Sequence, residues 1–139
     1  RHKVVFQCKS FVDLFGGAFG SPRIGSNGTV HPSKDTAMND YMFSVVVEND
    51  VYSNYFTEKV TDCFATKTVP VYFGSPNIQE VFDSTGILIL DPYNIGDLKT
   101  KLTPELYRSM LPAVERNFEI VKNMKMADDQ IFEKISSYS

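Results

Sequence analysis

Three short apolar runs, separated by polar loops and helical patterns, constrain the fold of this chain more than any other feature. They are rich in β-branched and aromatic residues and cover Phe43–Val47, Val69–Phe73 and Ile87–Leu90. Continuous runs of this kind are typical of strands that are buried on both faces of a sheet. A helix candidate over about Asn54–Ala65 lies between the first two runs. Strands that alternate with helices predict an α/β fold, in which a parallel sheet carries helices on both faces.

The other predicted elements complete one domain. A chain of 139 residues is long enough for one domain with a core and too short for two. Thr103 followed by Pro104 is typical of a helix N-terminus, within a region that has a helical pattern from Asn94 onward. The remaining elements are a helix over Arg1–Phe11, a short strand over Val12–Phe15, a short helix over Pro32–Asp40, a helical turn over Asn77–Phe82 and a last helix from about Asp128.

Charge and composition argue against several classes of function. The formal net charge of −3 disfavours nucleic acid as a partner, because nonspecific nucleic-acid binders usually have a basic balance. Cys8 and Cys63 each lie among apolar residues and are expected to be buried, inert thiols rather than a disulfide framework or a zinc site. Two histidines are too few for a histidine-based metal centre. No apolar run approaches the about 20 residues that a membrane-spanning helix needs.

The segment after the first predicted strand carries the strongest candidate binding site. The strand ends at Val47, a polar loop follows, and a helix is expected to begin near Asn54. The unpaired N–H groups and the positive end of the dipole at a helix N-terminus attract phosphate. In parallel α/β sheets, ligands bind beyond the carboxyl ends of the strands. The segment should lie at that edge.

Helical spacing divides this segment into two faces. The apolar face, which should be buried, carries Phe56, Val60, Cys63 and Phe64. The polar face carries Tyr55, Glu58, Lys59 and Asp62. Lys59 can reach a phosphate without being needed by the core, Glu58 can accept hydrogen bonds from ribose hydroxyls, and Tyr55 adds a hydroxyl or a stacking ring. The same spacing also fits a solvated face with a surface Glu–Lys pair, and spacing alone favours that alternative.

The residues themselves resemble a known family. Val47-Glu48-Asn49, five further residues and then Tyr55-Phe56-Thr57-Glu58-Lys59 are similar to the donor-site signature of the α1,3/4-fucosyltransferases. In that family a helix, a strand like Val-Pro-Val and a glycine follow, and Val69–Gly74 is similar to this continuation. Upstream, Lys34 and Tyr41-Met42-Phe43 match by position, and Arg1 stands where the family carries a phosphate-binding arginine.

The resemblance extends over Arg1–Asp91, with two departures. Val47 stands in place of the family's usual Phe. The stretch after Phe82 lacks the family's Pro and its Ser-Phe-Ile pattern. Both departures bear on the identity of the sugar more than on nucleotide binding.

The resemblance implies that residues 1–139 form the donor-binding domain of a two-domain glycosyltransferase of the GT-B type, with a Rossmann-like parallel sheet. Arg1 and Lys59 would neutralise the diphosphate of a GDP-sugar, and Glu58 would hold its ribose. Asn49 and Tyr55 would line the phosphate and sugar region. Lys34 matches a lysine of the family's donor domain by position.

The implied reaction is the transfer of fucose from GDP-fucose to a glycan acceptor, with inversion. Arg1 and Lys59, rather than a metal ion or another cofactor, would stabilise the charge that grows on the leaving diphosphate. In the resembled family the base that deprotonates the acceptor belongs to a preceding acceptor-binding domain, which this chain does not contain. We therefore assign no catalytic residue in this chain and expect it to bind donor without turnover when alone.

Two other interpretations remain open. Glu48-Asn49-Asp50 could supply metal ligands to a metal-dependent glycosyltransferase of another class, although such a site needs further carboxylates or phosphates. An α/β domain of this kind could also bind nucleotides or proteins without catalysis. Gly16–Gly20 follows a predicted strand but fits neither the dinucleotide fingerprint nor the P-loop, and is expected to be a loop.

Overall fold

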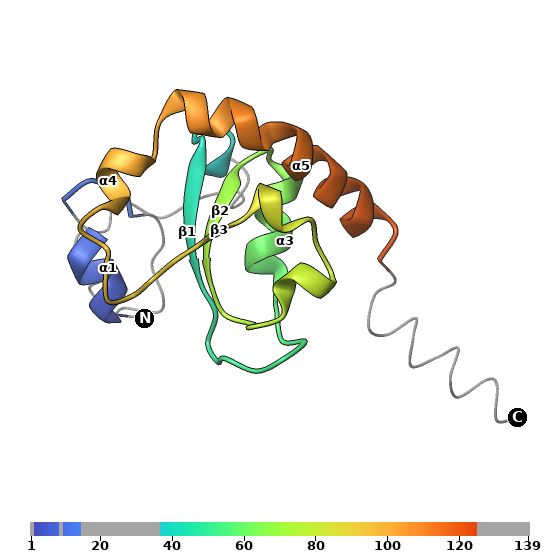
Figure 1. Cartoon of the computed structure of the whole chain (residues 1–139), viewed down its shortest axis with the longest axis horizontal. Coiled ribbons are helices and arrows are strands. Elements are labelled where there is room, and N and C mark those ends of the chain that lie inside the picture. The colour runs from blue at the N-terminus through green and yellow to red at the C-terminus, as the bar shows by residue number, and fades with distance from the viewer. Residues whose placement is uncertain (1, 9, 15–36, 125–139) are drawn as a thin grey trace, which may run out of the picture.

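The computed structural model describes residues 2–8, 10–14 and 37–124. Its centre is a three-stranded parallel sheet in the order β1-β2-β3, which confirms the α/β prediction (Figure 1). The strands are β1 (Phe43–Val47), β2 (Val69–Phe73) and β3 (Leu88–Ile89). The first two coincide with the predicted runs, whereas β3 covers only the two middle residues of its run.

Neighbouring residues of the central strands point to opposite faces of the sheet and reach separate apolar clusters. Val46 lies opposite Tyr72 in the register, and both belong to the cluster on one face. Val47 and Val71 belong to the cluster on the other face. This alternation follows from the two-residue period of a strand, and it lets the short sheet support a layer of helices on each side.

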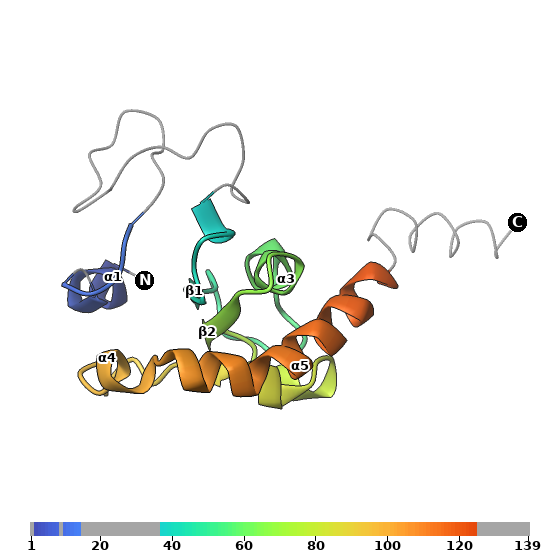
Figure 2. The same ribbon diagram turned by 90° about the horizontal axis from the view of Figure 1, so that it is seen from above.

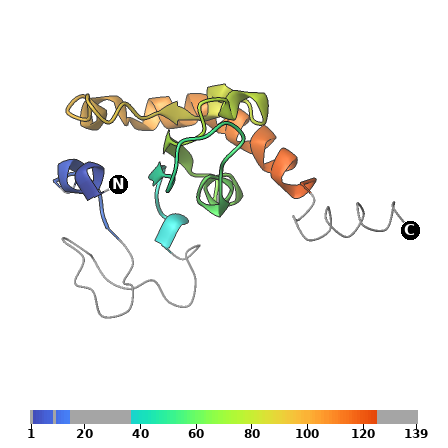
Figure 3. The ribbon, with the colours of Figure 1, turned by 90° about the horizontal axis from the view of Figure 1, so that it is seen from below.

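The helices cover the two faces as expected. The first cluster lies under α3 (Glu58–Ala65) and α5 (Pro104–Lys122), and the second lies under α1 (His2–Cys8) and α4 (Leu98–Lys101). Figure 2 shows α1 and α3 on opposite sides of the strands. Figure 3 shows α4 and α5 following each other along one side of the molecule. Two 3-10 turns, η1 (Ile78–Glu80) and η2 (Ser84–Gly86), connect β2 to β3.

Both cysteines are buried free thiols, as predicted. Burial raises the pKa of the Cys63 thiol to about 12 and also raises that of Cys8. A thiol with a raised pKa carries little thiolate at neutral pH, and thiolate is the reactive form. The two side chains therefore act as small apolar groups of the core.

Helix boundaries differ from the predictions at several points. The N-terminal helix ends at Cys8 rather than Phe11, and the strand predicted over Val12–Phe15 is reduced to a single bridge residue, Leu14. The predicted turn over Asn77–Phe82 is the shorter η1. Helix α5 begins at Pro104 with Thr103 as its N-cap, as expected. The loop over Gly16–Gly20 and the helix from Asp128 lie outside the described residues, as does most of the short helix over Pro32–Asp40.

The largest difference concerns the start of α3. The helix begins at Glu58, four residues after the predicted start at Asn54, and Thr57 is its N-cap. Asn54 has a φ of 65°, in the left-handed region that Asn tolerates better than most residues. A residue in that conformation cannot continue a right-handed helix. Residues 49–57 consequently form a loop, and this loop shapes the carboxyl edge of the sheet.

Candidate functional site at the carboxyl edge of the sheet

A buried carboxylate closes the loop that joins β1 to α3. The Glu48 side chain is fully buried (0% exposed). Its Oε1 accepts a hydrogen bond from the Thr57 N–H at 2.9 Å, and its Oε2 accepts one from the Thr57 hydroxyl at 2.7 Å. The Glu48 N–H donates to the carbonyl of Phe73 and thereby extends the ladder of β1 with β2. Glu48 thus connects the last residue of the loop to the end of the sheet.

Lys59 completes this cluster. Its Nζ donates to the Thr57 hydroxyl oxygen at 3.0 Å and lies 3.5 Å from Glu48 Oε2. Its side chain is 23% exposed, so the ammonium lies between a buried acid and the solvent. Glu58, by contrast, is 57% exposed, with Oε1 3.9 Å from the ammonium. The expectation that the core does not need the Lys59 ammonium therefore requires correction, because the ammonium neutralises a buried charge.

A second set of hydrogen bonds attaches the same loop to the segment after β2. The Asn54 N–H donates to Asn77 Oδ1, and Asn77 Nδ2 donates to Asn54 Oδ1, both at 2.8 Å. Ser75 Oγ also bonds Asn77 Oδ1 at 2.8 Å, and the Ser75 N–H donates to the buried hydroxyl of Tyr72 at 3.0 Å. Two loops at the same edge of the sheet are thereby fixed relative to each other.

Two tyrosine rings lie in the loop after β1. Tyr52 and Tyr55 make an edge-to-face contact with their centroids 5.9 Å apart. Tyr52 is 59% exposed, while Tyr55 is half-buried. A hydrogen bond to Asp50 raises the pKa of the Tyr52 hydroxyl. The loop therefore offers aromatic surface next to the polar cluster.

Four of the six predicted site residues fall in one segment at this edge: Asn49, Tyr55, Glu58 and Lys59. Asn49 and Tyr55 belong to the loop, whereas Glu58 and Lys59 occupy the first two positions of α3. The other two, Arg1 and Lys34, lie outside the described residues. The expected face made by Tyr55 with Glu58 and Lys59 is not a helical face, because Tyr55 precedes the helix.

The sequence assigns no role to Thr57, and to Glu48 only that of a metal ligand in the alternative interpretation. In the structure, both oxygens of Glu48 face Thr57 and Lys59 inside the protein. Asp50 instead bonds Tyr52 on the surface. Within the part of the chain that the structure describes, no three His, Cys, Asp or Glu side chains are grouped to hold a metal ion. One sequence signal could have indicated this contact: Glu48 directly follows a predicted strand, and Thr57 is a residue type that commonly caps a helix.

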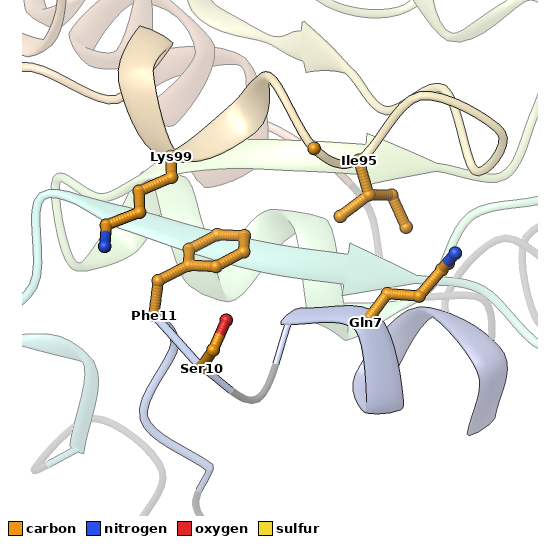
Figure 4. A pocket seen from close by; sticks show the side chains of 6 residues that line it. Gln7, Ser10, Phe11, Ile95 and Lys99 are labelled. Carbon is orange, nitrogen blue, oxygen red and sulfur yellow. The ribbon is translucent and has the colours of Figure 1, made fainter.

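A separate pocket of about 350 Å³ lies between α1 and α4 (Figure 4). It is lined by Gln7, Ser10, Phe11, Ile95, Gly96 and Lys99. None of the predicted site residues is among its lining residues. The polar cluster after β1 is therefore the stronger candidate site, since it combines a cation, hydrogen-bonding groups and a helix N-terminus.

This arrangement defines a class of site. A parallel α/β sheet whose carboxyl edge carries a lysine in the first turn of a helix is suited to a phosphate-containing ligand. The comparison with protein families then identifies the chain more closely. Residues 4–104 match the model of the C-terminal part of glycosyltransferase family 10 (fucosyltransferase), and the chain belongs to this family.

Two curated relatives are similar over shorter stretches. An α-(1,3)-fucosyltransferase from Helicobacter pylori is 30% identical over 67 residues, which are 48% of this chain and 13% of the relative. An α-(1,4)-fucosyltransferase from Arabidopsis thaliana is 39% identical over 44 residues, which are 32% of this chain and 11% of the relative. The chain thus matches a small part of the length of these relatives. No solved structure matches the chain. Among the described residues, no helix has both the length and the apolar character to cross a membrane.

Proposed function

We propose that residues 1–139 form the donor-binding domain of a fucosyltransferase, a Rossmann-like half of a GT-B enzyme that binds GDP-fucose. One observation carries the proposal: the residues that resemble the family's donor signature share one segment at the carboxyl edge of the sheet, with Lys59 in the first turn of α3. A diphosphate placed there meets both the ammonium and the positive end of the helix dipole.

Each residue of the segment has a proposed role. Lys59 binds the diphosphate, and the exposed Glu58 carboxylate accepts hydrogen bonds from the ribose hydroxyls. Tyr55 and Asn49 line the region of the phosphates and the sugar. Arg1 would add positive charge, as the resemblance implies, and Lys34 matches a lysine of the family's donor domain by position. An exposed acid beside a half-buried cation fits a ligand with both hydroxyl and phosphate groups.

The proposed reaction is inverting transfer to a glycan acceptor. An acceptor hydroxyl attacks the anomeric carbon of fucose, its proton passes to a carboxylate base, and the bond between that carbon and the diphosphate oxygen breaks. The departing GDP gains negative charge in the transition state, which a preorganised cation stabilises. We propose that Lys59 and Arg1 perform this task without a metal ion, and that the base belongs to the acceptor-binding part of the enzyme.

Calorimetric titration of the chain with GDP, GDP-fucose and UDP-glucose tests this function. We expect the two guanine nucleotides to bind more tightly than UDP-glucose, with affinities that chelation of divalent metal by EDTA leaves unchanged. Equal or stronger binding of UDP-glucose would overturn the assignment of the donor. A requirement for added magnesium would instead favour a metal-dependent transferase.

Substitution of lysines at the two ends of α3 locates the site. Lys59→Met also leaves the buried Glu48 without its positive partner, so its folding is first checked by thermal melting. The folded variant should bind GDP about ten- to a hundredfold more weakly, since a charge-assisted hydrogen bond contributes roughly 1.5–3 kcal/mol. The matched control is Lys67→Met, which removes an exposed lysine paired with Glu115 just after the helix ends. GDP binding should be unchanged in this control. Equal losses in both variants would show a nonspecific effect of charge and contradict the proposed site.

A further inference from the structure

We infer that Glu48 is a positioning residue, whose buried carboxylate holds the ammonium of Lys59 in place for a phosphate group before the ligand arrives. The inference rests on the proposed function, because it assigns to Glu48 a role in the binding of the same nucleotide-sugar. Glu48 acts through its neighbours: it is fully buried and meets the proposed ligand site through Thr57 and Lys59.

The contacts of Glu48 account for its burial. A buried carboxylate is costly unless its oxygens receive hydrogen bonds and a positive partner lies close by. Thr57 supplies two donors, its N–H and its hydroxyl, and Lys59 supplies the positive charge at 3.5 Å. The buried carboxylate of Glu48 and the ammonium of Lys59 therefore stabilise each other. A substitution at Glu48 should change how the Lys59 ammonium is held.

The Thr57 hydroxyl transmits the orientation from the acid to the lysine. A hydroxyl has one proton to donate, and at Thr57 that proton is directed to Glu48 Oε2 at 2.7 Å. Its lone pairs consequently point away from Glu48, and they accept from Lys59 Nζ at 3.0 Å and from the Lys59 N–H at 3.4 Å. Both the ammonium and the first turn of α3 are thereby placed by the same hydrogen-bonded unit.

This arrangement leaves the ammonium ready to bind. A lysine ammonium has three donors, and two of them face Thr57 and Glu48. The third lies on the exposed side, where the solvent-exposed Glu58 carboxylate is 3.9 Å away and a phosphate can approach the ammonium from the solvent. Lysine otherwise loses much rotamer freedom when a ligand fixes it. Because the cluster already fixes the Lys59 side chain, the entropy cost of ordering it is met during folding and does not weaken ligand binding.

Gly74 supports the same cluster from the neighbouring strand end. A Cβ at this position would lie 2.6 Å from Glu48 Cγ and would also collide with the hydroxyl of Tyr72. Both side chains are buried, so neither can move aside easily. Glycine at position 74 therefore leaves the space that the stem of Glu48 occupies.

A double-mutant cycle on GDP affinity tests the inference. Glu48→Gln keeps the shape of the side chain and removes its charge. In the wild-type background we expect it to weaken GDP binding about tenfold, and in the Lys59→Met background to change binding less than about twofold, because residues that act together show strong coupling. Asn77→Ala is the matched comparison, since it releases the same loop at Asn54 instead. Its loss should be the same in both backgrounds.

A second pair of variants covers the case in which Glu48→Gln does not fold. Thr57→Val removes the hydroxyl that connects the acid to the lysine, and Thr57→Ser keeps it. Thr57→Val should reproduce the loss of GDP affinity and its dependence on Lys59, while Thr57→Ser should bind as the wild type does. Equal losses with and without Lys59→Met, for either Glu48→Gln or Thr57→Val, would overturn the inference. Absence of GDP binding in the wild type would instead overturn the proposed function itself, and the inference with it.

Discussion

Truncation of Phe64 to alanine should remove a large part of the stability of this domain. The side chain is fully buried (0% exposed) in the cluster beneath α3 and α5, and its ring lies 5.0 Å from that of Phe82, centroid to centroid. Substitutions of buried Phe by Ala cost roughly 3–5 kcal/mol, because transfer free energy is lost and a cavity remains. Domains are stable by about 5–15 kcal/mol in total. The variant should therefore be close to the limit of folding.

Urea denaturation followed by circular dichroism measures this loss. We expect a lower midpoint with an unchanged slope, and a melting temperature lower by roughly 10–20 °C. Ala65→Ser is the control, because the neighbouring side chain on the same helix is exposed and its substitution should change stability by less than about 0.5 kcal/mol. A loss below about 1 kcal/mol in Phe64→Ala would contradict the packing of α3 against the sheet.

Three further predictions concern anchoring residues. Thr103→Ala should destabilise the domain by about 1 kcal/mol in urea denaturation, because the N-cap of α5 loses its side-chain acceptor; no change would contradict the cap. Hydrogen bonds from Thr85 and Arg116 lower the pKa of Asp83 from 3.8 to about 2, so its contribution to stability should be complete above pH 4 and disappear as the pH falls toward 2. Asp83→Asn should flatten the pH dependence of unfolding in that interval, and an unchanged curve would contradict the assignment. Gly74→Ala should lower both the melting temperature and GDP affinity, since the added methyl displaces Glu48; normal values of both would contradict the close packing.

The strands and the order of elements were predictable because they depend on local apolar runs. Phe43–Val47 and Val69–Phe73 need no tertiary information, since a nearly continuous run of β-branched and aromatic residues already indicates a buried strand. The start of α3 was not predictable in this way. Tyr55 and Phe56 continue the helical spacing of apolar residues in the sequence. The left-handed backbone of Asn54 and its bonds to Asn77 nevertheless keep this stretch out of the helix.

The sequence predicted which segment forms the candidate site. It did not predict the buried contacts that hold Lys59 in place. Lys59 and Glu58 could be selected because they belong to the segment that resembles the family's donor signature and lie near the beginning of a helix that follows a strand. The burial of Glu48 could not be foreseen, because a charged residue is expected at the surface unless its partners are known. Those partners become close only when the loop folds back and Thr57 reaches the strand end. The roles of Arg1 and Lys34 stay predictions.

The double attachment of the loop after β1 has a consequence for how such domains can diverge. Thr57 is tied to Glu48 and Asn54 to Asn77, so an insertion at either point would displace α3 from the sheet edge. The stretch Asp50–Ser53 lies between the attachments and is exposed. Exposed loop positions tolerate insertions and substitutions. The length and composition of these four residues can therefore change, in evolution or in the laboratory, while Thr57 and Lys59 keep their positions.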